Sequence, residues 1–386
     1  MMTWCIYKRN KFNWRRVSLR FVAMNLLDLA PSISVASFHP NPPGSTNATP
    51  AGAKKTYVRC ATARKTVNTE NPLDTPDNDG GYTTYPCSID VIRWLDETQP
   101  REDAEKELYQ YLYSNLMPFD VPNAESLGFH VSPSDDYLPD GLSNGIVGPS
   151  ISIALDAKQQ YSWTKHVPKS IYFEYVASFA SVNEPRNNWR PLFHDVIQNI
   201  IQDFEMKNGS QDLSVEQVVR VVNQNIWDKF YTGTQKTIFF QSGQTPLIYD
   251  PMSIIAYGYA SCTGLSIFLV DALRTVGIPA RLAGTAAWNG EKENGNHSWI
   301  EFFGSDSTWH IMESKPASGS NDENLFDPCQ WWFCNDARVQ GTSFYATRVN
   351  RSLADNAVFP LAWDSENISV VGEDRTNFMR DLCSQC

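Results

Sequence analysis

The chain has 386 residues, of which 42% are hydrophobic and 12% aromatic, enough to fill the core of one large domain or two ordinary ones. The formal net charge of −11 gives no support for binding to nucleic acids or anionic membranes. After the first forty residues, no stretch approaches the roughly 20 apolar residues that a transmembrane helix needs. We therefore expect no stable membrane insertion. The sequence shows no internal repeat and no nucleotide-binding glycine motif.

Residues 1–36 have the parts of a targeting segment. A basic stretch from Lys8 to Arg20 precedes an apolar run and a small-residue site, an order typical of a secretory signal. A transit peptide is a second interpretation, because residues 1–55 contain a single acid, Asp28. We expect export or delivery to an organelle, with a cytosolic tail as the alternative.

The remaining chain divides by composition and periodicity into four regions. Residues 37–100 are rich in Pro, Thr, Asn, Asp and Gly without sustained periodicity, which indicates a linker or a loosely ordered segment. Residues 101–190 are predicted to form a helical N-terminal region. Residues 191–350 are assigned to a core domain, and residues 351–386, which lack a clear pattern, to a C-terminal tail.

Within these regions, helical periodicity predicts four further helices after the one that begins at Arg101. They are expected at 151–160, 167–176, 189–206 and 214–231. At the start of the last helix, Ser214 and Gln217 form the pattern of a capping box, in which each residue's side chain bonds the other's backbone.

A small-residue turn at 257–261 leads to Cys262, which lies at the start of a predicted apolar helix. Hydrophobic residues recur every three or four positions from Leu265 to Val276, which predicts a helix with one buried face. Gly277 supplies the C-terminal stop. Free N–H groups and the positive end of the helix macrodipole favour the thiolate form of a cysteine in this position, and the thiolate is the nucleophile.

A base and an acid are predicted on the β-hairpin that follows. Residues 297–303 alternate as a strand, and 309–313 return after a turn at 304–307. With the turn centred on Ser305, the opposed pairs are Trp299 with Ile311, Glu301 with Trp309, and His297 with Glu313. A carboxylate opposite an imidazole holds one ring nitrogen while the other faces the thiol. A register shift of one residue would move Glu313 to the other face.

These residues resemble the transglutaminase-like superfamily, most strongly over about 250–315. The resemblance is carried by Gly258-x3-Cys262, Gly277-Ile-Pro-Ala-Arg281, Asn296-His-Ser-Trp-Ile-Glu301, and Trp309 four residues before an acid. A looser likeness to bacterial transglutaminase-like proteins extends to Met117-Pro-Phe-Asp120, Val167-Pro-Lys-Ser-Ile-Tyr-Phe173 and Gln330-Trp-Trp-Phe333.

The resemblance implies an α+β, papain-like core in which a cysteine begins a helix and a histidine and an acid lie on an antiparallel sheet. It makes Cys262 the nucleophile and His297 the base, and it places Glu313 at the position of the acid. The chain departs from the family pattern twice. Ser261 and Thr263 stand where many members have Gln and an aromatic residue, and the usual acid is Asp, one methylene shorter than Glu.

The chemistry that the resemblance implies is acyl transfer through a thioester. His297 takes the Cys262 proton, the thiolate attacks a carboxamide or peptide carbonyl, and ammonia or an amine leaves. A second amine then gives an isopeptide cross-link, whereas water gives deamidation or proteolysis. The expected partners are a protein or peptide with amide side chains and an amine or water acceptor, with no metal or cofactor. The alternatives are a cysteine protease or amide hydrolase on the same core, and a non-catalytic binding module.

Six other cysteines lie beyond the targeting segment: Cys60, Cys87, Cys329, Cys334, Cys383 and Cys386. An even number suits three disulfides in an exported protein. The alternative is a zinc site formed by the last four, but the spacing from Cys329 to Cys334 is long for a zinc pair. Disulfides are therefore the favoured interpretation.

The sequence assigns no catalytic role to two further features of the C-terminal half, an aromatic cluster and His310. The cluster Gln330-Trp-Trp-Phe333 is predicted either to line a substrate groove near Cys262 or to fill the core under the sheet. Strand alternation places His310 on the opposite face from Glu313, which predicts a structural role for it.

Overall fold

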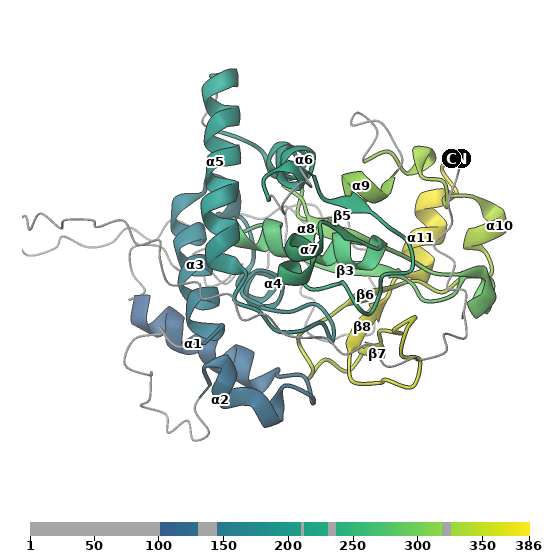
Figure 1. Ribbon diagram of the computed structural model, residues 1–386, viewed down its shortest axis with the longest axis horizontal. Helices are drawn as coiled ribbons and strands as arrows, with labels where there is room; N and C mark the ends of the chain where they lie inside the picture. The colour runs from purple at the N-terminus through teal and green to yellow at the C-terminus, as the bar shows by residue number, and fades with distance from the viewer. Residues whose placement is uncertain (1–100, 130–144, 210–211, 231–236, 319–325) are drawn as a thin grey trace, which may run out of the picture. The chain divides into compact units, whose positions relative to one another are not determined.

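The computed structural model of the chain describes residues 101–129, 145–209, 212–230, 237–318 and 326–386 (Figure 1). The predicted targeting segment, the predicted linker, Cys60 and Cys87 all lie outside the described residues. No helix within the described ranges has the length and apolar character to span a membrane.

The described residues combine helices with an antiparallel sheet, which confirms the predicted α+β class. The helices are α1 (Arg101–Ser114), α2 (Ala124–Leu127), α3 (Val147–Gln160), α4 (Lys169–Tyr175), α5 (Arg190–Asn208), α6 (Val215–Asn225), α7 (Pro251–Tyr257), α8 (Cys262–Thr275), α9 (Lys315–Ser318), α10 (Asp336–Val339) and α11 (Thr376–Cys383). The strands are β1 (Phe239–Phe240), β2 (Tyr259–Ala260), β3 (Ala280–Thr285), β4 (His297–Phe303), β5 (Trp309–Met312), β6 (Tyr345–Thr347), β7 (Ala357–Val358) and β8 (Val371–Asp374).

The helices that periodicity predicted are present. Those expected at 151–160, 167–176, 189–206 and 214–231 correspond to α3, α4, α5 and α6. The predicted capping box begins α6, because Ser214 accepts a hydrogen bond from the Gln217 backbone and Gln217 accepts one from the Ser214 backbone. Helix α6 ends earlier than expected, at Asn225, and a single 3₁₀ turn follows it.

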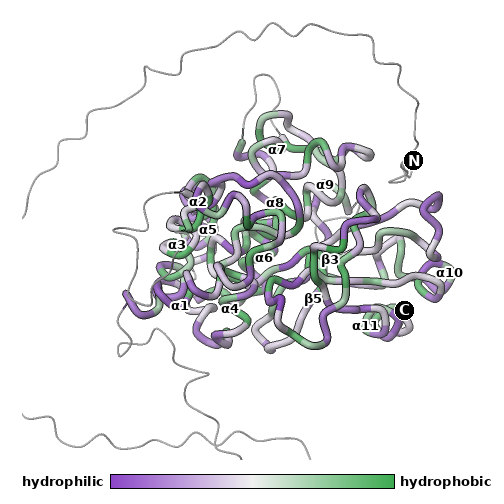
Figure 2. The backbone as a smooth tube through the Cα atoms, turned by 90° about the horizontal axis from the view of Figure 1, so that it is seen from below, coloured by the Kyte–Doolittle hydropathy of each residue, from purple (hydrophilic) through white to green (hydrophobic). Residues whose placement is uncertain are grey.

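Helix α8 is central to the fold, and every one of its residues is buried. Figure 2 shows its apolar backbone trace among other elements rather than at the edge of the molecule. Phe268 and Leu269 pack with α5, α6 and the sheet residue Ile300 in one apolar cluster. The predicted stop is present at Gly277, whose φ is +76° and where an added Cβ would lie 2.6 Å from Thr164.

The main sheet has six strands in the order β5-β4-β3-β6-β8-β7, all antiparallel to their neighbours. Helix α8 covers one face, where Ala280, Ile300 and Phe302 belong to its cluster. The opposite face carries a second cluster that includes Trp299, Ile311 and residues of α11. His297 and Glu301 share this second face with Trp299, because side chains alternate along β4.

The predicted register of the β4–β5 hairpin was wrong by two residues. Glu301 lies opposite Ile311 rather than Trp309, and Phe303 lies opposite Trp309. The turn is longer than expected because Gly304 and Thr308 close it through a backbone hydrogen bond of 2.8 Å. A shift of two residues preserves the face of every side chain, so Glu313 keeps the face of His297 but lies diagonal to it rather than opposite.

The residues assigned to a C-terminal tail form part of the sheet. Residues 351–386 contribute β7, β8 and α11, and their short strands carry too little periodicity to be recognised in the sequence. The four cysteines of the zinc alternative are joined instead as the disulfides Cys329–Cys386 and Cys334–Cys383. These bonds connect the segment before α10 to the end of α11.

A buried ionic network connects the strand that carries His297 to its neighbours. Arg281 on β3 donates to Glu301 on β4 at 2.6 and 2.9 Å and to Glu373 on β8 at 2.7 Å. Arg375 donates to the other oxygen of Glu301 at 2.9 Å. The Arg281 guanidinium also lies 4.0 Å from the ring centroid of Trp309. The network thus joins β3, β4, β5 and β8 at one place on the sheet.

Replacing Arg281 with Ala is expected to lower the free energy of unfolding by about 3 kcal/mol, because the fully buried Glu301 loses one of its two guanidinium partners. Chemical denaturation monitored by circular dichroism measures the effect. The matched control is Arg101→Ala, which removes partly exposed pairs with Glu105 and Asp156 and should cost about 1 kcal/mol or less. Equal losses in the two variants would contradict the assigned importance of burial.

Candidate active site

Cys262 is the first residue of α8, and one residue, Ser261, separates it from the short strand β2. Ser261 is the N-cap, with extended backbone, and its carbonyl accepts the first helical hydrogen bond from Leu265. Cys262 therefore occupies the helix start that the sequence predicted, where unpaired N–H groups favour an anionic sulfur. Its thiol is not part of a disulfide.

The start of α8 is held against the start of β4 through Ser298. The Thr263 and Ser298 hydroxyls lie 3.1 Å apart, and the Ser266 hydroxyl donates to the Ser298 carbonyl at 3.2 Å. Ser298 directly follows His297. These two contacts therefore fix the position of the cysteine-bearing helix relative to the histidine-bearing strand.

The structure brings the three predicted site residues together. His297 Nε2 lies 2.5 Å from Glu313 Oε1, and the other ring nitrogen, Nδ1, is the one left for the Cys262 thiol. Cys262, His297 and Glu313 are 1%, 3% and 2% exposed, respectively. Glu313 directly follows β5 and lies diagonal to His297 rather than opposite it. Its side chain is one methylene longer than that of Asp, which helps the carboxyl group span the diagonal.

Burial and charge act in opposite directions on His297. Burial lowers the pKa of the imidazole, but hydrogen bonds to Cys262 and Glu313 outweigh it and raise this pKa to about 10. Burial raises the pKa of the Glu313 carboxyl, and contact with His297 opposes that rise. A pKa of about 10 favours the protonated ring at neutral pH. An imidazolium that has taken its proton from the Cys262 thiol leaves a thiolate beside it, the arrangement that activates a cysteine nucleophile.

Four aromatic side chains surround the His297 ring. The distances from its centroid are 5.1 Å to Trp332, 5.3 Å to Phe333, 5.8 Å to Trp299 and 6.5 Å to Trp288. Phe333 is fully buried and stacks on Trp299. Part of the predicted aromatic cluster thus fills the core, and Trp332 lies beside the imidazole. The two disulfides hold the segment on both sides of this cluster.

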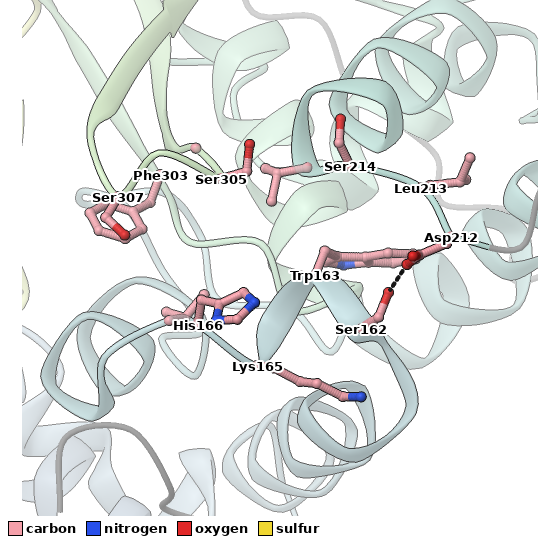
Figure 3. A pocket seen from close by; sticks show the side chains of 13 residues that line it. Ser162, Trp163, Lys165, His166, Asp212, Leu213, Ser214, Phe303, Ser305 and Ser307 are labelled. Carbon is pink, nitrogen blue, oxygen red and sulfur yellow. Dashed lines mark hydrogen bonds between the residues drawn. The ribbon is translucent and has the colours of Figure 1, made fainter. Parts of the chain in front are cut away.

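The cavity in Figure 3 lies at the other end of β4 and includes none of the three site residues. Its volume is about 390 Å³, and it lies between the start of α6 and the β4–β5 turn. His297 begins β4 and the turn follows its last residue, Phe303, so the two are roughly 20 Å apart along an extended strand. Within the cavity the Ser162 hydroxyl donates to Asp212, and the imidazole of His166 lies at one side.

His310 lies in the β4–β5 hairpin, away from the three site residues. Its ring stacks on Phe302, and its Nε2 is 2.9 Å from Asp306 within the turn. Among the described residues, no three His, Cys, Asp or Glu side chains come together as metal ligands would.

Sequence reasoning did not select Asn223 or Ser298, which hold the site from either side. Asn223 Nδ2 donates to the Glu313 carbonyl at 2.9 Å, and Ser298 contacts the start of α8. A signal for Asn223 exists, because it is a polar residue next to Val222 on the apolar stripe of α6. Ser298 carries no such signal.

The Cys262→Ala variant should show a lower pKa for His297, because the hydrogen bond to the thiol contributes most to raising it. NMR titration of the imidazole nitrogens measures this pKa among the six histidines of the chain.

The contribution of the protonated His297 ring to the free energy of unfolding should be fully present below pH about 6.5 and lost as the pH rises towards 10.

His310 serves as the internal control for the NMR measurement, because its contacts with Phe302 and Asp306 do not involve Cys262. Its imidazole NMR signals at pH 7 should be the same in both proteins. Identical curves for His297 in both proteins would contradict an interaction between the thiol and the imidazole.

Comparison with known families supports the assignment of the fold. Residues 205–314 match the model of the transglutaminase-like superfamily, a range that begins in α5 and ends just beyond Glu313. No curated protein and no solved structure gives a significant match. The matched range contains α6, α8, β3, β4 and β5, the elements that position Cys262, His297 and Glu313. The chain therefore contains a domain of the transglutaminase-like superfamily.

Proposed function

We propose that the protein is a thiol acyltransferase in which Cys262 is the nucleophile, His297 the base and Glu313 the acid that orients the imidazole. The observation that carries this proposal is the buried arrangement of the three side chains at the start of α8 and on the β4–β5 hairpin. A buried histidine whose raised pKa favours the protonated ring, beside a cysteine and a carboxyl group, matches the requirements of nucleophilic catalysis.

In the proposed reaction, the proton of the Cys262 thiol resides on His297 as an imidazolium, and the resulting thiolate attacks the carbonyl carbon of a carboxamide. The C–N bond then breaks, His297 returns the proton to the leaving nitrogen, and ammonia departs from a thioester on Cys262. An incoming amine attacks the thioester, gives its proton to His297 and releases the thiol as an amide forms. Protein glutamine is the proposed acyl donor, as expected from the family resemblance.

The apolar surroundings of His297 support transfer to an amine over hydrolysis. Trp288, Trp299, Trp332 and Phe333 lie around the ring and limit the space for water beside the thioester. Hydrolysis by the same three catalytic residues would instead deamidate glutamine or cleave a peptide bond. The remaining alternative is a domain that catalyses no reaction and acts by binding alone. The thiol's reactivity distinguishes the last case from the others.

Iodoacetamide should alkylate Cys262 at pH 6 at least about tenfold faster in the native protein than in His297→Ala. An unassisted thiol with an ordinary pKa of about 8.5 is under about 1% ionised at that pH, whereas an adjacent imidazolium favours the thiolate. Peptide mapping by mass spectrometry assigns the label to Cys262. Because Cys262 is 1% exposed, the informative quantity is the ratio of rates between variants at the same pH.

His310→Ala is the matched control, since it removes a histidine from the same hairpin that does not contact Cys262. Its Cys262 alkylation rate should lie within about twofold of the native rate, because the thiolate is unaffected. Equal rates with and without His297 would instead favour the non-catalytic binding module.

A further inference from the structure

Glu313 lies where the regular backbone pairing of the hairpin has ended. Strand β5 stops at Met312, and α9 begins at Lys315, so Glu313 and Ser314 form the junction between them. Only Oε1 of the Glu313 carboxylate contacts His297, and within the described residues Oε2 has no hydrogen-bond partner. The direction of the carboxylate therefore depends on how its own backbone is held.

Asn223 on α6 holds that backbone on both sides of the junction. Its Nδ2 donates to the Glu313 carbonyl at 2.9 Å, and its Oδ1 accepts from the Lys315 N–H at 2.9 Å. The side chain is fully buried. A carboxamide carries a donor group and an acceptor group in one plane. The Asn223 side chain therefore pairs with the Glu313 carbonyl and the Lys315 N–H in the way that the backbone of a neighbouring strand would.

The same helix also contacts the other end of the hairpin. Glu216, in the first turn of α6, accepts hydrogen bonds from the Ser305 backbone at 2.9 Å and from its hydroxyl at 2.8 Å. Glu216 and Asn223 are seven residues apart and thus on one face of the helix. Helix α6 therefore contacts the hairpin at its turn through Glu216 and at its open end through Asn223.

We propose that Asn223 is a positioning residue of the active site, which sets the direction of the Glu313 carboxylate toward His297 and so sustains the reactive state of Cys262. The inference rests on the proposed function, because it assigns Asn223 a role in orienting the acid of that triad. Asn223 would thus be a fourth residue that determines the reactivity of the Cys262 thiol, and it lies on α6, a helix that contains none of the three proposed catalytic residues.

The test is a double-mutant cycle on the alkylation of Cys262 by iodoacetamide from pH 5 to pH 9. We expect Asn223→Ala to slow alkylation at pH 6 about tenfold, as much as Glu313→Gln does. In the Glu313→Gln background, Asn223→Ala should slow it by less than about twofold, because the orienting effect has already been lost. Independent, multiplying effects in the double variant would overturn the proposal.

Glu216→Ala is the matched control, since it removes the contact of the same helix with the turn end of the same hairpin. Its alkylation profile should stay within about twofold of the native profile, even where its thermal stability falls. A Glu216→Ala profile as strongly altered as that of Asn223→Ala would show a general structural effect of α6 and overturn the proposal.

Asn223→Asp covers the case in which Asn223→Ala does not fold. A protonated carboxyl offers the same donor and acceptor pair as the amide, whereas the ionised form cannot donate to the Glu313 carbonyl. We expect the alkylation rate of Asn223→Asp to be close to that of the native protein at pH 5 and to fall increasingly below it as the pH rises. A ratio of the two rates that stays constant from pH 5 to pH 9 would overturn the proposal. If Glu313→Gln itself leaves Cys262 reactivity unchanged, the assignment of Glu313 in the proposed function fails instead.

Discussion

The geometry of the candidate active site depends on the packing of α8 against the start of β4. All fourteen residues of α8 are buried, and each fully buried leucine or phenylalanine contributes roughly 1.5–3 kcal/mol. That apolar packing fixes the helix over Ile300 and Phe302, while Ser298 fixes its first turn through two polar contacts. Because Cys262 begins this helix and His297 begins this strand, the same packing determines their separation.

Charge in the interior is the second constraint. Burial alone would lower the pKa of the His297 imidazole, but the interactions with Cys262 and Glu313 raise it, and Glu313 contacts Nε2 directly. The aromatic side chains around it keep the local dielectric low, which strengthens these contacts. Two disulfides and α11 hold the aromatic segment in place. The C-terminal residues thus contribute to the environment of the site without supplying any of its three predicted members.

Much of the site could be predicted from sequence because its signals are local. The apolar period after Cys262, the Gly277 stop and the alternation from His297 to Phe303 each fix an element within a few residues. The register of the hairpin was not predictable, because it depends on the turn from Gly304 to Thr308 closing two residues wider than assumed. The outcome for Glu313 was unaffected because an even shift keeps the face of a side chain.

The parts that could not be predicted depend on contacts between distant residues. The strands β7 and β8 are two and four residues long, too short for a periodic signal. They form because β8 pairs with β6 on one side and with β7 on the other. The pairing of Cys329 with Cys386 requires knowledge of where α11 lies. The role of Asn223 likewise appears only when α6 is placed beside the end of β5.

The most direct test of the proposed chemistry is to follow ammonia release and the intact mass of the protein during incubation with glutamine-containing peptides. The proposal predicts a transient adduct on Cys262 with the mass of the peptide less ammonia. A small primary amine should discharge the adduct and form the corresponding amide, and Cys262→Ala should abolish both signals. Ammonia release that continues in Cys262→Ala, or its absence from both proteins, would contradict acyl transfer through Cys262.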